Sequence, residues 1–286
     1  MVLHVAARWG SPELALDVIK TLQSMQVTWQ EHHFAPVIEA FCRQNQVKQA
    51  FEVLGTIRDY HVTPDSGTAY PIYKAISGNV SSVDAAWKHL DDLHADGKRV
   101  DALALDVVLR AAVRIQDLQR ALGIYKAYPD FNASPSIDTF NILLVGCTRV
   151  SQRQLGDKLM TEMTEAGIKP NAKTYEGVIE LCLSQPTYED AFYYLEEMKA
   201  EGFTPPPSTY VRIIKKCVLN GDSRHQLAME EMRSLGYEIP KSLQAFIDSG
   251  GKDAEDKPDT SETFAAGRPL RREHDVSLAS NTGIIL

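Results

Sequence analysis

The chain has 286 residues, of which 44% are hydrophobic and 24% are charged, a composition typical of a folded protein that can bury a core. No apolar run approaches the roughly 18 residues that a membrane-spanning helix needs. The formal net charge is −8, which excludes general attraction to phosphate over the whole surface and leaves room only for a basic stripe on one face. Four cysteines without close pairs offer neither a disulfide framework nor a zinc knuckle.

The N-terminal stretch MVLHVAARWGSPELALDVIK is neither a signal peptide nor an Arg- and Ser-rich transit peptide, so we expect folded protein from the first residue. Farther along, similar proline-marked segments recur. They are VTPDSGTAY from Val62, ASPSIDTFN from Ala133, EAGIKPNAKTY from Glu165 and FTPPPSTYV from Phe203.

A step of 35 residues relates these segments. Pro135, Pro170 and Pro205 are spaced by 35, and Pro64 lies 71 residues before the first of them. Three residue columns recur in the same frame. A Thr followed by an aromatic residue stands at Thr139-Phe140, Thr174-Tyr175 and Thr209-Tyr210. A cysteine stands at Cys147, Cys182 and Cys217, and an alanine at Ala15, Ala50, Ala121 and Ala191. A fixed period of this length predicts an array of one repeated supersecondary unit.

The unit is predicted to be a pair of helices. After each proline, a run such as TFNILLVGCTRV (139–150) has apolar residues at helical spacing, and QLGDKLMTEMTEAG (154–167) supplies a second amphipathic helix. The Gly that ends the second run suits a left-handed cap, and the proline beyond it blocks continuation. Neither helix can bury its apolar stripe alone, so the pairs are expected to stack into an α-solenoid with a concave face lined by the first helix of each pair.

The 35-residue period, the Thr-aromatic-Asn opening and the EM-x-x-x-G-I-K-P-N close resemble the pentatricopeptide repeat family, best seen in residues 137–171. Tetratricopeptide repeats have a period of 34 and a different signature. The resemblance implies an all-α, right-handed α-solenoid of stacked helix-turn-helix repeats. It is closest to the organellar members of the family, fungal mitochondrial ones in particular.

In that frame the solenoid is expected to span residues 1–250. Met1 falls at the sixth position of a repeat, so the first repeat is expected to be partial. The predicted units are 1–30, 31–65, 66–101, 102–136, 137–171, 172–206 and 207–241, with a partial capping helix at 242–250. Residues 251–286 are rich in Asp, Glu, Ser, Thr and Gly without helical periodicity and are predicted to form a disordered tail.

The resemblance implies single-stranded RNA binding, in which the fifth and last residues of a repeat together hydrogen-bond one base edge. The candidate base-reading pairs are Asn141 with Asn171, Asp106 with Ser136, and Tyr70 with Asp101, where Tyr70 would stack on a base. The other repeats depart from the pattern, and Glu176 at a fifth position would repel nearby phosphate.

Four arginines share one repeat position near the end of the first helix: Arg8, Arg43, Arg114 and Arg149. A row of guanidinium groups with the spacing of the repeat would track a phosphate backbone. The alternative is that these side chains cap helix C-termini and interact with the helix dipole. The sequence leaves both interpretations open.

The motifs of common catalytic sites are missing from the sequence: there is no H-x-E followed by C-x-x-C, no phosphate-binding G-x-x-x-x-G-K-[ST] and no H-E-x-x-H. We therefore expect no enzymatic activity, no metal site, no cofactor and no membrane insertion. The function that the resemblance implies is RNA stability, processing or translation in mitochondria. The alternative is a scaffold or assembly factor that holds a protein partner in the groove and reads little RNA sequence.

Overall fold

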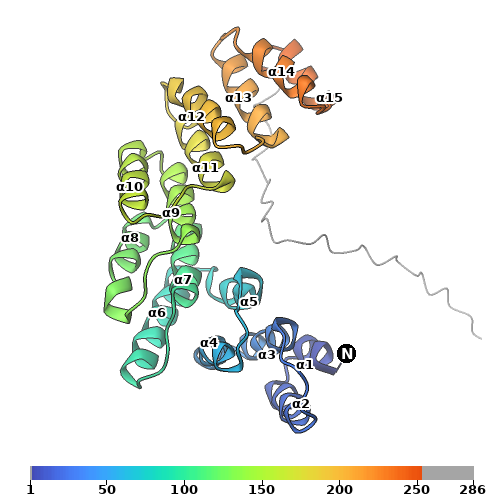
Figure 1. The fold of residues 1–286 in the computed structure, drawn as a ribbon, viewed down its shortest axis with the longest axis vertical. Helices are drawn as coiled ribbons and strands as arrows, with labels where there is room; N and C mark the ends of the chain where they lie inside the picture. Colours follow the sequence, from blue (N-terminus) through green and yellow to red (C-terminus); the bar gives the residue numbers. More distant parts are fainter. Residues whose placement is uncertain (1, 253–286) are drawn as a thin grey trace, which may run out of the picture.

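The structure is a computed structural model that describes residues 2–252 of the chain (Figure 1). The predicted disordered tail falls, from residue 253 onward, outside the described residues. Between residues 2 and 252 the regular structure is entirely helical, and none of these helices is long and apolar enough to cross a bilayer.

The helices form consecutive antiparallel pairs. The first helices of the pairs are α1 (Val2–Trp9), α3 (Glu31–Arg43), α5 (Ser66–Ile76), α7 (Ala102–Arg114), α9 (Ile137–Arg149), α11 (Ala172–Leu183) and α13 (Pro207–Leu219). The second helices are α2 (Pro12–Ser24), α4 (Val47–Thr56), α6 (Val80–Ala95), α8 (Leu118–Lys126), α10 (Arg153–Glu165), α12 (Glu189–Ala200) and α14 (His225–Ser234), and α15 (Lys241–Asp248) follows the last pair. Two 3-10 turns, η1 (Ile57–Tyr60) and η2 (Tyr128–Phe131), extend the ends of α4 and α8.

Side-chain caps fix where the first helices begin. Ser136 and Asn171 occupy the N-cap positions of α9 and α11, and each forms a reciprocal capping box with the Thr three residues later, Thr139 or Thr174. These bonds satisfy backbone N–H groups that the first turn of a helix leaves unpaired. At the other end of a pair, Gly167 takes a positive φ of 71° after α10, the left-handed conformation that Gly adopts at little cost.

The pairs stack in two layers along the chain. Each first helix packs on the first helices before and after it, from α1 through α15, while each second helix packs on its own first helix. Figure 1 shows the resulting curved array, in which α6, α8 and α10 lie along one edge and α7 and α9 lie inside them. The predicted all-α solenoid of helix pairs is confirmed.

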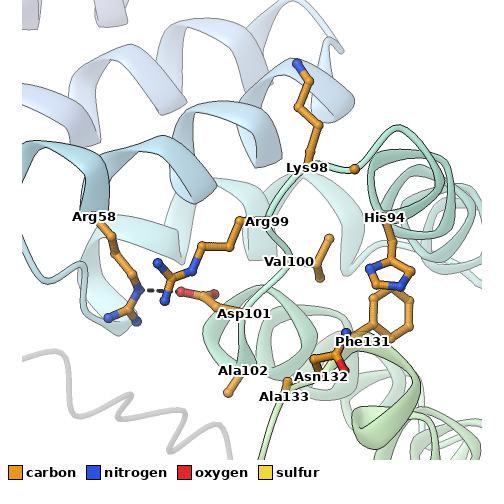
Figure 2. A pocket seen from close by; sticks show the side chains of 11 residues that line it. Arg58, His94, Lys98, Arg99, Val100, Asp101, Ala102, Phe131, Asn132 and Ala133 are labelled. Atoms are coloured by element: carbon orange, nitrogen blue, oxygen red, sulfur yellow. Dashed lines mark hydrogen bonds and ion pairs between the residues drawn. The ribbon is translucent and has the colours of Figure 1, made fainter.

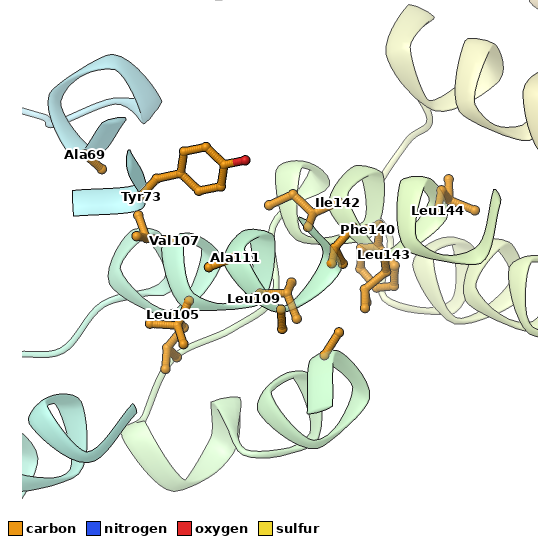
Figure 3. Close-up of a cluster of buried hydrophobic side chains, with 14 of the residues drawn as sticks. Ala69, Tyr73, Leu105, Val107, Leu109, Ala111, Phe140, Ile142, Leu143 and Leu144 are labelled. Carbon is orange, nitrogen blue, oxygen red and sulfur yellow. The ribbon is translucent and has the colours of Figure 1, made fainter. Parts of the chain in front are cut away.

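The core is a continuous strip between the layers. In the stretch around α7 and α9, Leu105, Leu109, Phe140 and Leu143 are at most 2% exposed (Figure 3). Burying one such side chain fully stabilises the fold by about 1.5–3 kcal/mol. Because every pair shares this strip with its neighbours, stability depends on adjacent repeats rather than on one central core.

The predicted alanine column lies on the second helices, where it is almost completely buried. The exposed fraction is 0% at Ala15, Ala50, Ala121 and Ala191, and it is 1% at Ala86, which joins the column after a one-residue insertion in its repeat. A methyl side chain lets the second helix approach its neighbours closely, which explains why one repeat position requires a small residue.

Candidate nucleic-acid interface

The pair Asn141 and Asn171 comes together as the sequence predicts. Asn141 lies on α9 and Asn171 caps α11, and the Asn141 Nδ2 atom is 3.5 Å from Asn171 Oδ1. Both side chains are partly exposed. The hydroxyl of Thr174 donates to Asn141 Oδ1 over 2.8 Å, so the two amides form one hydrogen-bonded group on the first-helix face.

Asp106 lies inside the stack instead. Its side chain is 6% exposed, and its Oδ1 atom accepts from Tyr128 Oη and Thr139 Oγ1, both over 2.7 Å. Burial raises the pKa of Asp106 to about 6, although both hydrogen bonds act in the opposite direction. Its predicted partner Ser136 is occupied as the N-cap of α9. In this structure Asp106 therefore joins two repeats and does not present a carboxylate to the groove.

In the pair Tyr70 and Asp101, only Tyr70 is exposed on the surface. The Tyr70 ring is 43% exposed on α5, which suits a stacking surface. Asp101 is only 11% exposed at its side chain, accepts from Arg58 Nε over 2.6 Å and caps α7 through Ala104 N–H. In Figure 2 the guanidinium groups of Arg58 and Arg99 both lie near the carboxylate of Asp101, and all three residues line a cavity of about 540 Å³.

The four aligned arginines do not form one uniform row. Arg43 is bound by Glu39 one turn earlier, over 2.8 Å. Arg149 donates from Nη1 to the carbonyls of Val113 and Arg114 at the end of α7, over 3.2 and 3.3 Å. Arg8 is exposed on α1. Arg149 thus caps a neighbouring helix, as the alternative interpretation predicted, yet stays exposed.

The arginines of the middle repeats lie near Tyr73, a residue that was not among the predicted site residues. Burial raises the pKa of Tyr73, while hydrogen bonding and charge from Arg114 and the charges of Arg110 and Arg149 act to lower it. We call Tyr73, Arg110, Arg114 and Arg149 the central basic cluster. The exposed Tyr70 ring stands beside it, 6.0 Å from the Tyr73 ring centroid.

Arg110 precedes Arg114 by four residues and therefore lies on the same helical face, a signal that the sequence does contain. Arg110 forms no ion pair with any other residue in the described part of the chain. A small cavity beside it is lined by Tyr70, Tyr73 and Asp106. The charge of Arg110 acts on the nearby carboxyl group of Asp106, where it opposes the effect of burial on the pKa.

The first-helix face carries charges of both signs toward the C-terminus. Glu180 on α11 binds Arg212 on α13 over 2.8 Å. Burial raises the pKa of Glu176 one turn earlier on α11, against the charges of Arg212 and Lys173. The central basic cluster is therefore followed by a stretch of mixed charge.

The cysteine column contributes packing to the core. Cys147, Cys182 and Cys217 are buried, and burial raises the pKa of each thiol to about 11. Among residues 2–252, no cluster of three or more His, Cys, Asp or Glu side chains is arranged to hold a metal ion.

Comparison with known proteins decides the family. A family model described as pentatricopeptide repeat-containing protein matches residues 1–128, and one described as pentatricopeptide repeat domain matches residues 158–220. Together they span more than half of the chain. The chain belongs to the pentatricopeptide repeat family.

Curated pentatricopeptide repeat proteins match over much of this chain. A mitochondrial pentatricopeptide repeat-containing protein of Arabidopsis thaliana is 24% identical over 63% of this chain and 30% of its own length. The mitochondrial 15S rRNA processing factor ppr3 of Schizosaccharomyces japonicus is 20% identical over 74% of this chain and 27% of its own length. The present chain spans less than a third of the length of either relative.

Solved pentatricopeptide repeat structures share the fold. The crystal structure of PPR10 from maize aligns over 86% of this chain and 35% of its own, with a TM-score of 0.50 and 22% identity. PPR10 in complex with an 18-nt psaJ RNA element aligns over 87% of this chain and 40% of its own, with the same TM-score and 14% identity.

Proposed function

We propose that this pentatricopeptide repeat protein binds single-stranded RNA along its first-helix face and acts in mitochondria in the stability, processing or translation of transcripts. The observation that carries the proposal is the central basic cluster next to the exposed Tyr70 ring, with the partly exposed Asn141 and Asn171 amides on the following first helices.

Each part of this surface suits one component of a nucleotide. Guanidinium groups bind phosphate oxygens with directed N–H bonds. An exposed tyrosine ring stacks on any base without selecting its identity. Side-chain amides offer and accept hydrogen bonds at a Watson–Crick edge. The surface therefore supports binding that depends mainly on phosphate contacts and stacking, with base reading concentrated at Asn141 and Asn171.

The relatives support the same chemistry. PPR10 has been crystallised with an RNA element, and the Schizosaccharomyces protein is named as an rRNA processing factor of mitochondria. The Arabidopsis relative is also named mitochondrial, which supports the proposed compartment. The function proposed is that of an RNA-binding adaptor without catalytic activity of its own.

A salt titration tests the proposal. Binding of a fluorescently labelled single-stranded RNA pool is followed by anisotropy from about 50 to 300 mM salt. We expect log Kd to rise with log salt concentration with a slope of about 0.7 per phosphate contact. Arg110→Gln should weaken binding and lower the slope by about that amount, because one counterion fewer is released.

Arg43→Gln is the matched control, since it removes the same charge from a first helix where Glu39 already neutralises it. The control should bind RNA nearly as tightly as the unsubstituted protein. If Arg43→Gln lowered the RNA affinity as much as Arg110→Gln, the assignment of RNA binding to the central basic cluster would be contradicted.

A protein-binding scaffold is the second candidate function. It is favoured by the placement of Asp106 inside the stack and by the partly buried Glu176 and Glu180 on the same face of α11. Carboxylates in the groove repel phosphate but suit a basic peptide. Absence of RNA binding at about 50 mM salt, where phosphate contacts are strongest, would favour the scaffold over the RNA-binding function.

A further inference from the structure

The cavity of about 540 Å³ beside Asp101 lies along the loop that joins α6 to α7. Its walls come from three successive repeats, through Arg58 of η1, the loop at residues 97–101 and Phe131 of η2. The residues that line it include no member of the central basic cluster. The cavity is therefore a concave site of its own, separate from the surface to which RNA binding is assigned.

The two 3-10 turns account for the position of this cavity. The repeats on either side of the loop extend their second helices by η1 and η2, which end at the left-handed residues His61 and Asn132. The repeat between them ends its second helix without such a turn, at Gly97. The loop after α6 thus lies between two longer closures, and the cavity lies with it.

The backbone of this loop is held against α4, which fixes where Arg99 begins. A Cβ atom on Gly55 would lie 2.7 Å from the carbonyl oxygen of Arg99, a contact too close for any side chain, so the approach requires glycine. The preceding residue, Lys98, is bound by Glu52 over 3.3 Å. Arg99 itself is exposed and forms no ion pair with any residue between 2 and 252, so its N–H donors are available to a ligand.

Arg58 is oriented in the same cavity by a carboxylate. Its Nε atom donates to Asp101 Oδ2 over 2.6 Å, and Asp101 Oδ1 accepts the backbone N–H of Ala104 over 3.1 Å. The Nη groups of Arg58 make no hydrogen bond within the described part of the chain. Figure 2 shows the guanidinium group of Arg99 near the same carboxylate. One carboxylate thus faces two guanidinium groups, and cationic charge is left over at this end of the cavity.

The other end of the cavity is aromatic and apolar. The ring centroids of His94 and Phe131 are 5.0 Å apart, and Val100 and Ala133 add aliphatic surface. In Figure 2 the two rings lie on the far side of Val100 from the guanidinium groups. A volume of about 540 Å³ lies within the range of about 300–1,000 Å³ that small-molecule sites occupy. A ligand that fills this space meets guanidinium donors at one end and rings at the other.

We propose that this cavity binds a phosphate monoester of about mononucleotide size, with its phosphate at Arg58 and Arg99 and its organic group toward Phe131. A monoester carries a charge of about −1.5 to −2 at pH 7 and three acceptor oxygens, which suit two guanidinium forks. A phosphodiester inside an RNA chain carries one charge and a substituent on each side. The monoester has a single substituent, which can point toward the rings.

Two sources supply this chemistry, a free mononucleotide and the 5′-phosphate at the end of an RNA. Isothermal titration of the full chain with adenosine 5′-monophosphate tests the cavity, and adenosine is the matched probe without phosphate. We expect the nucleotide to bind with a Kd below about 1 mM and adenosine to bind at least about tenfold more weakly, because charged hydrogen bonds are lost.

Arg99→Gln should weaken binding of the nucleotide about tenfold. Its urea unfolding should be unchanged, because Arg99 is exposed and unpaired between residues 2 and 252. Arg233→Gln is the matched control, since it removes an equally exposed arginine from the last turn of α14, outside the cavity. The control should bind the nucleotide as tightly as the unsubstituted protein.

One single-stranded RNA with either a 5′-phosphate or a 5′-hydroxyl separates the two sources. Tighter binding of the 5′-phosphate form, lost in Arg99→Gln, would assign the cavity to an RNA end. Equal binding of both forms, with the nucleotide still bound, would assign it to a free mononucleotide.

Three results would overturn the inference: equal binding of adenosine and the nucleotide, equal weakening by Arg233→Gln and Arg99→Gln, or no nucleotide binding at about 10 mM together with no effect of the 5′-phosphate. The inference does not depend on the proposed RNA-binding function. Nucleotide binding without any RNA binding would overturn that function alone.

Discussion

The carboxyl group of Asp106 provides the sharpest test of how the repeats are joined. Its pKa is about 6 instead of the ordinary 3.8, so the folded protein holds a proton between about pH 4 and 6 that the unfolded chain releases. The free energy of unfolding therefore falls as pH rises through this window. Above the window the folded protein bears the full cost of holding the Asp106 carboxylate in a buried site. The difference between the pKa values of the folded and unfolded states corresponds to about 3 kcal/mol in the free energy of unfolding.

Asp106→Asn removes the ionisation and keeps an amide oxygen for Tyr128 and Thr139. The variant should be more stable than the unsubstituted protein at pH 8, by up to about 3 kcal/mol. The advantage should shrink toward zero near pH 4.5, where Asp106 is itself protonated. Urea unfolding followed by circular dichroism between pH 4.5 and 8 measures the difference at each pH.

Asp130→Asn serves as the control, because it removes an exposed carboxylate from η2. Its effect on unfolding should be small at every pH. If the stability difference caused by Asp106→Asn were the same at pH 5 and pH 8, or if the variant were the less stable protein at pH 8, the explanation from a buried and poorly ionised carboxyl group would be refuted.

Four further predictions concern packing and helix stability, and they are measured by urea unfolding or, for the last, by thiol labelling. Gly156→Ala should destabilise the fold by about 1–3 kcal/mol, since the new Cβ would lie 2.1 Å from Leu181 Cδ2. Gly123→Ala, which meets nothing within 4 Å, should instead stabilise helix α8 by up to about 1 kcal/mol. Leu109→Ala should cost about 2–5 kcal/mol through the cavity it leaves. Cys147, which is fully buried with its pKa raised to about 11, should react with a thiol reagent at neutral pH only as fast as the protein opens; rapid labelling of the folded protein would contradict its placement.

The sequence predicted the helix pairs because the repeat is encoded locally. The glycine and proline at the end of a pair and the Thr-aromatic start of the next fix the helix boundaries within a few residues of chain. The contact between Asn141 and Asn171 was also predictable, because both belong to one well-formed copy of the repeat. The apolar spacing of each helix then decides which face is buried, and stacking follows from it.

The direction of the fifth-position side chains was not predictable in the same way. Asp106 turns inward because Tyr128 and Thr139 both donate to it, and Tyr128 comes from the 3-10 turn η2, whose path the repeat pattern does not encode. The sequence does contain the pairing of Arg43 with Glu39 at a spacing of four residues. The contacts of Arg149 with the carbonyls of α7 depend instead on the offset between neighbouring helices, which only the assembled stack defines.

The hydroxyl of the Thr in the first turn of a first helix, as at Thr139 and Thr174, joins neighbouring repeats of this solenoid. A first helix needs the Thr for its capping box, and the same Thr needs an acceptor on the preceding helix. Where that acceptor is a carboxylate in the stack, as in Asp106, the bond strengthens the junction and withdraws the side chain from the groove. Where it is a partly exposed amide, as in Asn141, the side chain joins the two repeats and still reaches the first-helix face. Few repeats of this chain meet the second condition, so the RNA binding proposed above would rest mainly on phosphate contacts and stacking. Such binding is strongly salt-dependent and only weakly sequence-selective.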